Sequence, residues 1–172
     1  DRLYNVNWNN VDSEGQARSK YVLEERRVDQ NDINIGTNVK WTASKVFTLT
    51  GGINYKWNRT EYYKKLDDLL GGDYYMNIDQ FAERDFASNQ AMVQNDLDYY
   101  LANGSAQILR QGDKYGYDYY ANVRKAEIWA NGAFDFGGFK ANLALQAGYE
   151  TFWRDGLVRK GLFPGLKDDG SE

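Results

Sequence analysis

The sequence contains no cysteine and no histidine in 172 residues. Without cysteine, neither a disulfide framework nor a thiolate metal site can form within the chain. Without histidine, serine–histidine and cysteine–histidine catalysis are excluded, and the commonest transition-metal ligand is missing. Proline occurs once, and no apolar run approaches the length of a membrane-spanning helix. These absences remove several classes of enzyme, metalloprotein and helical membrane protein.

Charge gives no sign of a nucleic-acid partner. Lys and Arg total 21, Asp and Glu total 25, and the formal net charge is −4. Phosphate binding needs clustered positive charge, which this balance does not supply. We therefore expect no nucleic acid among the partners.

Aromatic residues and glycine are abundant instead. Aromatic side chains make up 16% of the chain, with 14 tyrosines and 5 tryptophans, and there are 17 glycines. Strands favour aromatic residues, and Trp and Tyr also gather where a membrane meets water. The composition therefore favours a β-rich protein.

The first predicted hairpin comprises strands at residues 21–43 and 45–60. Apolar and polar side chains alternate with a period of two, which is typical of a strand with two different faces. The apolar face carries Ile33, Ile35, Val39, Trp41, Phe47, Leu49, Gly51, Ile53, Tyr55 and Trp57. The opposite face carries mostly Asn, Thr, Lys and Asp.

The second predicted hairpin comprises strands at 117–136 and 139–154, joined at Gly137 and Gly138. Glycine reaches the positive φ angles that tight turns need. The apolar face carries Ala126, Ile128, Ala130, Gly132, Phe134, Phe136, Phe139, Ala141, Leu143, Leu145, Ala147 and Tyr149. Trp129 is the exception, because it falls on the polar face.

Polar segments flank and separate the hairpins. Residues 1–20, 61–116 and 155–172 are predicted loops, and the middle one is too long for an ordinary compact domain. Leu66, Leu69 and Leu70 have helical spacing and precede Gly71 and Gly72, a predicted C-terminal cap. A second helix is predicted from residue 88 to 102. Short turns on one side and long loops on the other are typical of outer-membrane barrels.

The order of residue types along the apolar face favours a membrane barrel over a soluble sheet. Aromatic residues flank a middle of small and aliphatic residues, as a lipid band would require. Ten strand steps separate Phe47 from Trp57, and at about 3.3 Å a step and a tilt of roughly 40° they cover about 25 Å of membrane. The predicted lipid-facing girdle comprises Trp41, Phe47, Tyr55, Trp57, Phe134, Phe136, Phe139, Tyr149 and Trp153.

The predicted fold class is therefore all-β: an antiparallel transmembrane β-barrel meander with a long, partly helical extracellular loop. About 4–6 strands are visible, and roughly eight are needed to close the smallest membrane barrels. We expect this chain to be a partial barrel, with the remaining strands elsewhere in the same protein.

Several segments resemble the TonB-dependent outer-membrane receptors, and among them the SusC-like and carboxypeptidase-regulatory-like group. Each segment is short, and their order and spacing carry the resemblance. The segments are YVLEER at 21–26, NRTEYY at 58–63, LLGGD at 69–73, FAERD at 81–85, YGYDYY at 115–120, WRDG at 153–156 and RKGLFP at 159–164.

The resemblance implies a barrel of roughly 22 strands closed by a plug domain. Such proteins lie in the bacterial outer membrane and import a bulky ligand, such as a glycan, a peptide or a siderophore, into the periplasm. The implied partners are the lipid bilayer, the rest of the barrel with its plug, the TonB system and, in some members, a surface SusD-like lipoprotein. The plug has no counterpart here. The alternatives are a soluble extracellular β-rich binding module and a small porin-like structural barrel.

No catalytic, cofactor or metal site is predicted. Close carboxylates such as Asp96 and Asp98 lack the defined separation of an acid–base pair and match no EF-hand loop. We therefore expect a protein that is not an enzyme and needs no cofactor. Tyrosine can make amphipathic contacts with a ligand or pack the loop against the rim. The predicted ligand vestibule comprises Tyr62, Tyr63, Tyr74, Tyr75, Tyr99 and Tyr100.

Overall fold

The computed structural model describes residues 4–167. Strands account for 57% of the chain and helices for 8%, with antiparallel sheets, which confirms a mostly β fold. Neither of the two helices is long and apolar enough to cross a membrane, within the described residues. The chain divides into two compact units. Unit 1 comprises Asp1–Asp29, Thr60–Ala121 and Arg154–Glu172, and unit 2 comprises Gln30–Arg59 and Asn122–Trp153.

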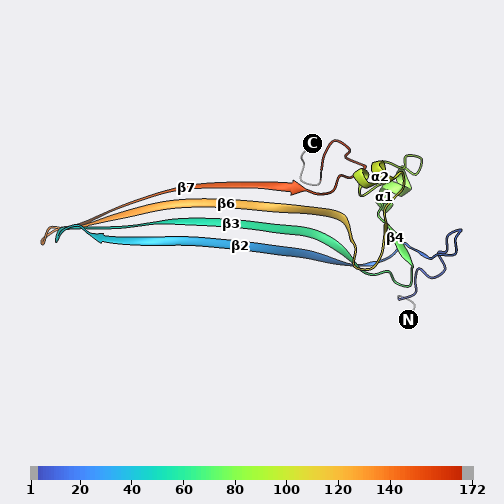
Figure 1. Ribbon diagram of the computed structural model, residues 1–172, viewed down its shortest axis with the longest axis horizontal. Coiled ribbons are helices and arrows are strands. Elements are labelled where there is room, and N and C mark those ends of the chain that lie inside the picture. Colours follow the sequence, from blue (N-terminus) through green and yellow to red (C-terminus); the bar gives the residue numbers. More distant parts are fainter. Residues whose placement is uncertain (1–3, 168–172) are drawn as a thin grey trace. The chain divides into compact units, whose positions relative to one another are not determined.

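Four long strands form the main sheet (Figure 1). They are β2 (Leu23–Thr42), β3 (Phe47–Asp68), β6 (Lys114–Asp135) and β7 (Lys140–Gly156), and they lie side by side in that order. Strands β3 and β6 are therefore neighbours although residues 69–113 separate them in sequence. Within residues 4–167 the sheet is open, with β2 and β7 at its edges and no barrel closed.

Two tight turns join the strands in pairs. Between β2 and β3, the backbone N–H of Ala43 donates to the Phe47 carbonyl at 3.1 Å. Between β6 and β7, the backbone N–H of Phe136 donates to the Phe139 carbonyl at 2.9 Å. Gly137 has a φ of 83° in this turn, a conformation that residues with a side chain rarely adopt.

The strand ends differ from the predicted ones. β3 continues to Asp68, past the predicted end at residue 60, and β6 begins at Lys114 rather than at 117. The helix predicted around Leu66 is wrong, because Leu66 lies in β3 and Leu70 has a positive φ of 49°. The helix predicted at 88–102 is also wrong over most of its length, because the observed helix begins only at residue 97.

The predicted middle loop contains short elements of its own. They are β4 (Tyr74–Met76), α1 (Gln80–Asp85), α2 (Leu97–Asn103) and β5 (Ile108–Leu109). The side chains of Asp79 and Asp96 cap the helices α1 and α2, and Gly104 ends α2 in the left-handed conformation. With β1 (Arg18–Ser19), the strands β4 and β5 form a small second sheet in the order β1-β4-β5.

Unit 1 has a hydrophobic core in two clusters. Leu66, Tyr75 and Leu109 form the first, and Val22, Leu69 and Tyr115 pack against it. Ile78, Ala82 and Val93 form the second, against which Met76, Ala106 and Leu162 pack. The long middle segment is therefore a packed structure, and one of its tyrosines, Tyr75, belongs to the first cluster.

Candidate functional site

The sheet in unit 2 has a polar face. Its side chains line a shallow hollow of about 280 Å³ and include Asn34, Asn54, Lys56, Lys125 and Glu127. The ammonium of Lys125 lies 2.9 Å from Glu127, and that of Lys56 lies 3.6 Å from Asp32. The polar positions of neighbouring strands therefore meet on one side of the sheet, as their alternation predicts.

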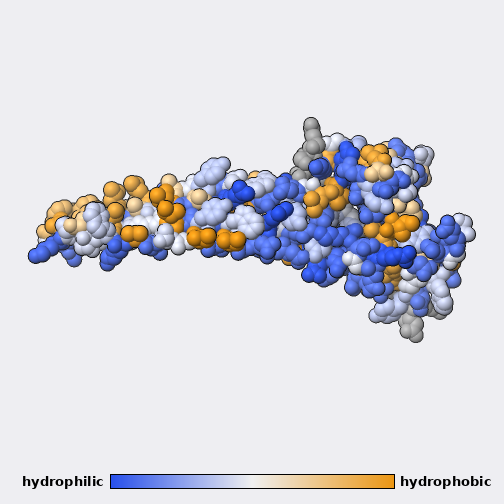
Figure 2. All heavy atoms as spheres, viewed as in Figure 1, coloured by the Kyte–Doolittle hydropathy of each residue, from blue (hydrophilic) through white to orange (hydrophobic). Residues whose placement is uncertain are grey.

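The opposite face of the same strands is apolar. A shallow groove of about 320 Å³ on this face is lined mainly by Ile53, Ala126, Ile128, Ala147 and Tyr149. Leu145 is 68% exposed and Tyr149 is 72% exposed. Figure 2 shows hydrophobic side chains gathered along the strands of unit 2. We call this surface the apolar face, and no part of residues 4–167 covers it.

Burial along β6 is the reverse of what a soluble sheet shows. Ile128 on the apolar face is 56% exposed, whereas Lys125, Glu127 and Trp129 on the polar face are half-buried. Soluble sheets place the apolar face against a core and leave the polar face in water. Over residues 124–130 of β6 the polar-face side chains are therefore the more enclosed, whereas most positions of β2 and β7 are exposed on both faces.

The predicted girdle residues fall into two groups on the apolar face. Near the turns, the rings of Phe47 and Phe134 stack with centroids 4.8 Å apart, and Phe136 lies 6.3 Å from both Phe134 and Phe139. Trp41 lies at the same end of β2. The second group, at the other end of unit 2, comprises Tyr55, Trp57, Tyr149 and Trp153. Five of the nine are exposed and four are half-buried, Phe47, Trp57, Phe134 and Trp153.

A row of tyrosines lies on β6 in unit 1. Tyr115, Tyr117 and Tyr119 occupy alternate positions and therefore share one face of the strand. The ammonium of Lys64 lies 5.5 Å from the Tyr115 ring centroid and 5.6 Å from that of Tyr117. Tyr62 stacks on Tyr119 with centroids 5.2 Å apart. The row is thus held by contacts from β3.

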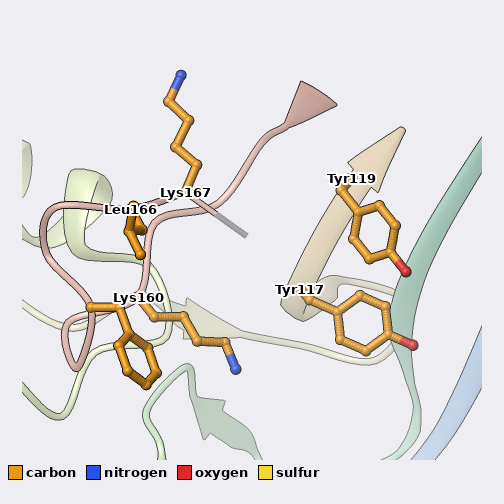
Figure 3. Close-up of a pocket in the computed structure, with 6 residues that line it drawn as sticks. Tyr117, Tyr119, Lys160, Leu166 and Lys167 are labelled. Carbon is orange, nitrogen blue, oxygen red and sulfur yellow. The ribbon is translucent and has the colours of Figure 1, made fainter. Parts of the chain in front are cut away.

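Two clefts adjoin this row. The first has a volume of about 440 Å³, and Figure 3 shows β6 on one side and the C-terminal segment on the other. It is lined by Tyr117, Tyr119, Lys160, Phe163, Leu166 and Lys167. The second, of about 410 Å³, shares Tyr117 and Lys160 with the first. It also includes Lys20, Glu24, Lys64, Tyr75, Phe81 and Tyr115. Both volumes are within the range of small-molecule sites.

Glu24 is the most strongly perturbed acid of the second cleft. Burial raises the pKa of its carboxyl, but hydrogen bonds from Tyr115, Lys64 and Arg26 outweigh burial and lower the pKa to about 2. Lys64 donates at 2.9 Å and Arg26 at 2.7 Å. Burial, followed by the bond to Glu24, raises the pKa of Tyr115. The carboxylate is therefore ionised and already satisfied by protein donors.

The structure separates the six tyrosines of the predicted vestibule. Tyr62 contacts Tyr119, and Tyr75 lines the second cleft edge-on to Tyr115, 5.5 Å away. Tyr63 is buried, where its hydroxyl donates to Asp29 at 2.7 Å. Like Tyr62 and Tyr63, the other three tyrosines line neither cleft. Tyr74 is buried in β4, and Tyr99 and Tyr100 are half-buried on α2.

The predicted vestibule includes one residue that lines a cleft, Tyr75, but neither the tyrosine row on β6 nor Lys160. Tyr115, Tyr117 and Tyr119 carry a recognisable signal, a tyrosine at every second position of a strand. Lys160 has none, because it comes from a segment about forty residues further along the chain. Only the packing of that segment brings its ammonium towards the tyrosines (Figure 3).

The acidic residues considered for metal binding have other roles. Asp96 accepts a hydrogen bond from the backbone N–H of Tyr99 at 2.9 Å and so caps α2. Asp98 forms an ion pair with Arg159. Across residues 4–167, no group of three or more acidic side chains is placed to hold a metal ion.

The sequence matches no family model and no curated protein. The resemblance to TonB-dependent receptors therefore rests on the seven short sequence segments alone.

Proposed function

We propose that the chain is a segment of a bacterial outer-membrane β-barrel of the TonB-dependent receptor type. In this proposal the apolar face contacts lipid, the polar face lines the barrel interior, and the tyrosine clefts form part of the vestibule for a bulky imported ligand. Partners are the remaining strands, the plug, the TonB system and the bilayer; among such receptors, SusC-like members often also have a surface lipoprotein.

The exposed apolar face is the observation that carries the proposal. Leaving apolar area in water costs about 25 cal/mol per Å², so a long face of Leu, Ile and Ala requires a cover. Acyl chains provide one, and the two aromatic groups then lie at the two boundaries with water. The ten steps from Phe47 to Trp57 correspond to about 25 Å of membrane height.

The open edges of the sheet support the same proposal. β2 and β7 present long rows of backbone groups without a neighbouring strand among residues 4–167. A lipid environment tolerates strands only when every backbone group is paired, which closure into a barrel achieves. Further strands of the same protein would complete the pairing at both edges.

Labelling of single cysteines tests which face contacts lipid. The chain has no cysteine, so variants Leu145→Cys and Gln146→Cys introduce one thiol on each face. With the protein in vesicles, an environment-sensitive maleimide dye at position 145 should show the fluorescence emission of a hydrocarbon environment. The same dye at position 146 should show the emission of a more aqueous environment. Water-like emission at both positions, with protein released from membranes without detergent, would favour the soluble-module alternative.

A further inference from the structure

We propose that the two clefts bind a ligand that presents a carboxylate or sulfate group beside a flat, largely apolar ring face. The inference rests on the proposed vestibule role and deepens it by naming the ligand chemistry. Uronic-acid sugars and aromatic acids both have this chemistry, and the experiment below distinguishes them.

The first cleft combines rings with positive charge. Tyr117 and Tyr119 provide one wall, and the apolar side chains of Phe163 and Leu166 lie on the other segment. The two charged residues of the lining, Lys160 and Lys167, are both cationic. A ring-bearing anion can pack against the apolar surfaces while its charged group meets an ammonium, which forms a charge-assisted hydrogen bond.

The carboxylates of the second cleft are already engaged by the protein. Glu24 accepts bonds from Lys64, Arg26 and Tyr115. Asp79 accepts from the backbone N–H of Phe81 at 3.0 Å and of Ala82 at 3.2 Å, because it caps α1. These acids therefore have little capacity left to attract a cationic ligand.

Two lysines of the clefts, unlike these carboxylates, are not engaged by an oppositely charged group of the described residues. In the part of the chain that the structure describes, the ammonium groups of Lys20 and Lys160 form no ion pair. Lys160 lies where both clefts meet. The net electrostatic preference of the lining is thus for an anion.

The backbone that carries Lys160 is fixed before any ligand arrives. The carbonyl of Arg159 accepts from the Leu97 N–H at 2.7 Å, and the N–H of Gly161 donates to the Gln94 carbonyl at 2.9 Å. The Arg159 side chain also pairs with Asp98. Binding therefore loses little backbone entropy at this position, which favours affinity.

An acidic peptide fits this site less well. Extended peptides are commonly bound by adding a strand to a free sheet edge. The strand that carries the tyrosines, β6, lies between β3 and β7 in the sheet, and past the end of β7 the N–H of Leu157 still donates to the Asp118 carbonyl at 2.9 Å. Aromatic residues and lysines make up much of the lining of both clefts, which suits a ligand recognised by its rings and charge.

The experiment is isothermal titration calorimetry on the full protein that carries this chain, purified in detergent micelles. The probes are two matched pairs, trigalacturonate with galactotriose and benzoate with benzamide, together with triglutamate. Variant Lys160→Gln removes the cation at the junction of the clefts. Variant Lys40→Gln is the control, because Lys40 lies on β2 outside both clefts.

We expect the acidic member of at least one pair to bind about tenfold or more tightly than its neutral partner. The pair that shows this preference identifies the ligand as a uronic-acid sugar or as an aromatic acid. Lys160→Gln should remove most of this preference, Lys40→Gln should retain it, and added salt should weaken it. Equal binding within both pairs, no binding of any ring probe, triglutamate binding as tightly as the ring acids, or an unchanged preference in Lys160→Gln would each overturn the inference. The labels at positions 145 and 146 decide the barrel proposal separately, so the two can fail independently.

Discussion

The guanidinium of Arg154 lies 3.9 Å from the ring centroid of Tyr119, across the boundary between β7 and β6. Tyr62 of β3 stacks on the same ring. Three neighbouring strands are therefore connected through one tyrosine, which also lines the first cleft. Such cross-strand contacts stabilise a sheet and here also fix one wall of the cleft.

Replacing Tyr119 with Ala should destabilise unit 1 by about 1–3 kcal/mol, because both the ring stack and the cation–π contact are lost. Tyr119→Phe retains the ring and should cost much less. Urea unfolding in micelles, followed by tryptophan fluorescence, measures both variants. Equal urea midpoints of unfolding for Tyr119→Ala and Tyr119→Phe would mean that the aromatic ring adds nothing to stability beyond the contribution of the hydroxyl group.

Asn7 should be essential for the N-terminal segment of unit 1. Its side chain is 1% exposed, donates to the carbonyls of Tyr21 at 2.6 Å and Leu69 at 2.7 Å, and accepts from the Lys20 N–H at 2.9 Å. Asn7→Ala leaves these backbone groups without their partner, at a cost of about 2–4 kcal/mol.

Limited proteolysis measures the effect of Asn7→Ala, because loosened N-terminal residues should be cleaved sooner than in the parent protein. Asn9→Ala is the matched control, since the Asn9 side chain is exposed. Identical cleavage rates for Asn7→Ala and Asn9→Ala would argue against a structural role for the buried amide.

The Glu24 cluster predicts a dependence of stability on pH. The pKa of Glu24 in the folded protein, about 2, is below its ordinary value of 4.5. A lowered pKa stabilises the folded state above the ordinary value, and this stabilisation is lost as pH falls from about 4.5 towards 2. Above about pH 5 the contribution is complete and constant.

Comparison of the parent protein with Glu24→Gln isolates this contribution. The difference in the free energy of unfolding should be constant between pH 5 and 8 and should shrink as pH falls below about 4.5. Urea titrations at a series of pH values measure it. A difference that stays the same from pH 7 down to pH 3 would contradict the ionised, hydrogen-bonded state of Glu24.

A charge on the apolar face distinguishes a lipid-facing sheet from a soluble one. In the proposed barrel, Leu145→Arg places a cation in the acyl region at a cost of roughly 2–4 kcal/mol near the midplane. Gln146→Arg puts the same charge on the polar face and should be tolerated. The yield of folded, heat-modifiable protein in outer membranes measures both, and equal yields would contradict lipid contact at position 145.

The strands were predictable because the alternation of apolar and polar residues that indicates them lies within short stretches of consecutive residues. Along residues 47–57 of β3 and along β7, apolar and polar residue types alternate between the two faces, so the alternation alone indicates a strand there. Leu66 misleads because its spacing to Leu69 and Leu70 is helical, whereas its packing partners Tyr75 and Leu109 come from other segments. Contacts between distant segments override local spacing there, as is usual for weak helix signals.

The clefts were only partly predictable for a related reason. Alternating tyrosines on β6 can be recognised from the sequence, but which loop covers them cannot. Lys160 reaches its place because Gly161 packs closely against residues 91 and 92. Such a fit depends on the complete fold of unit 1.

That close packing leads to a prediction about Gly161. A Cβ atom added there would overlap the carbonyl oxygen of Ala91, so the C-terminal segment would have to move away from its support. Gly161→Ala should therefore destabilise unit 1 and displace Lys160, even though it changes no charge. Gly165→Ala is the control, because a Cβ atom added at Gly165 meets nothing within 4 Å.

Hydrogen exchange measured by mass spectrometry tests the displacement directly. In the parent protein, the N–H of Gly161 is protected by its bond to the Gln94 carbonyl and that of Leu97 by its bond to Arg159. Both sites should exchange faster in Gly161→Ala and at the parent rate in Gly165→Ala, because an amide exchanges when its hydrogen bond opens. Parent-like protection in Gly161→Ala would mean that the neighbouring backbone accommodates the methyl group, and glycine would then not be required to position Lys160.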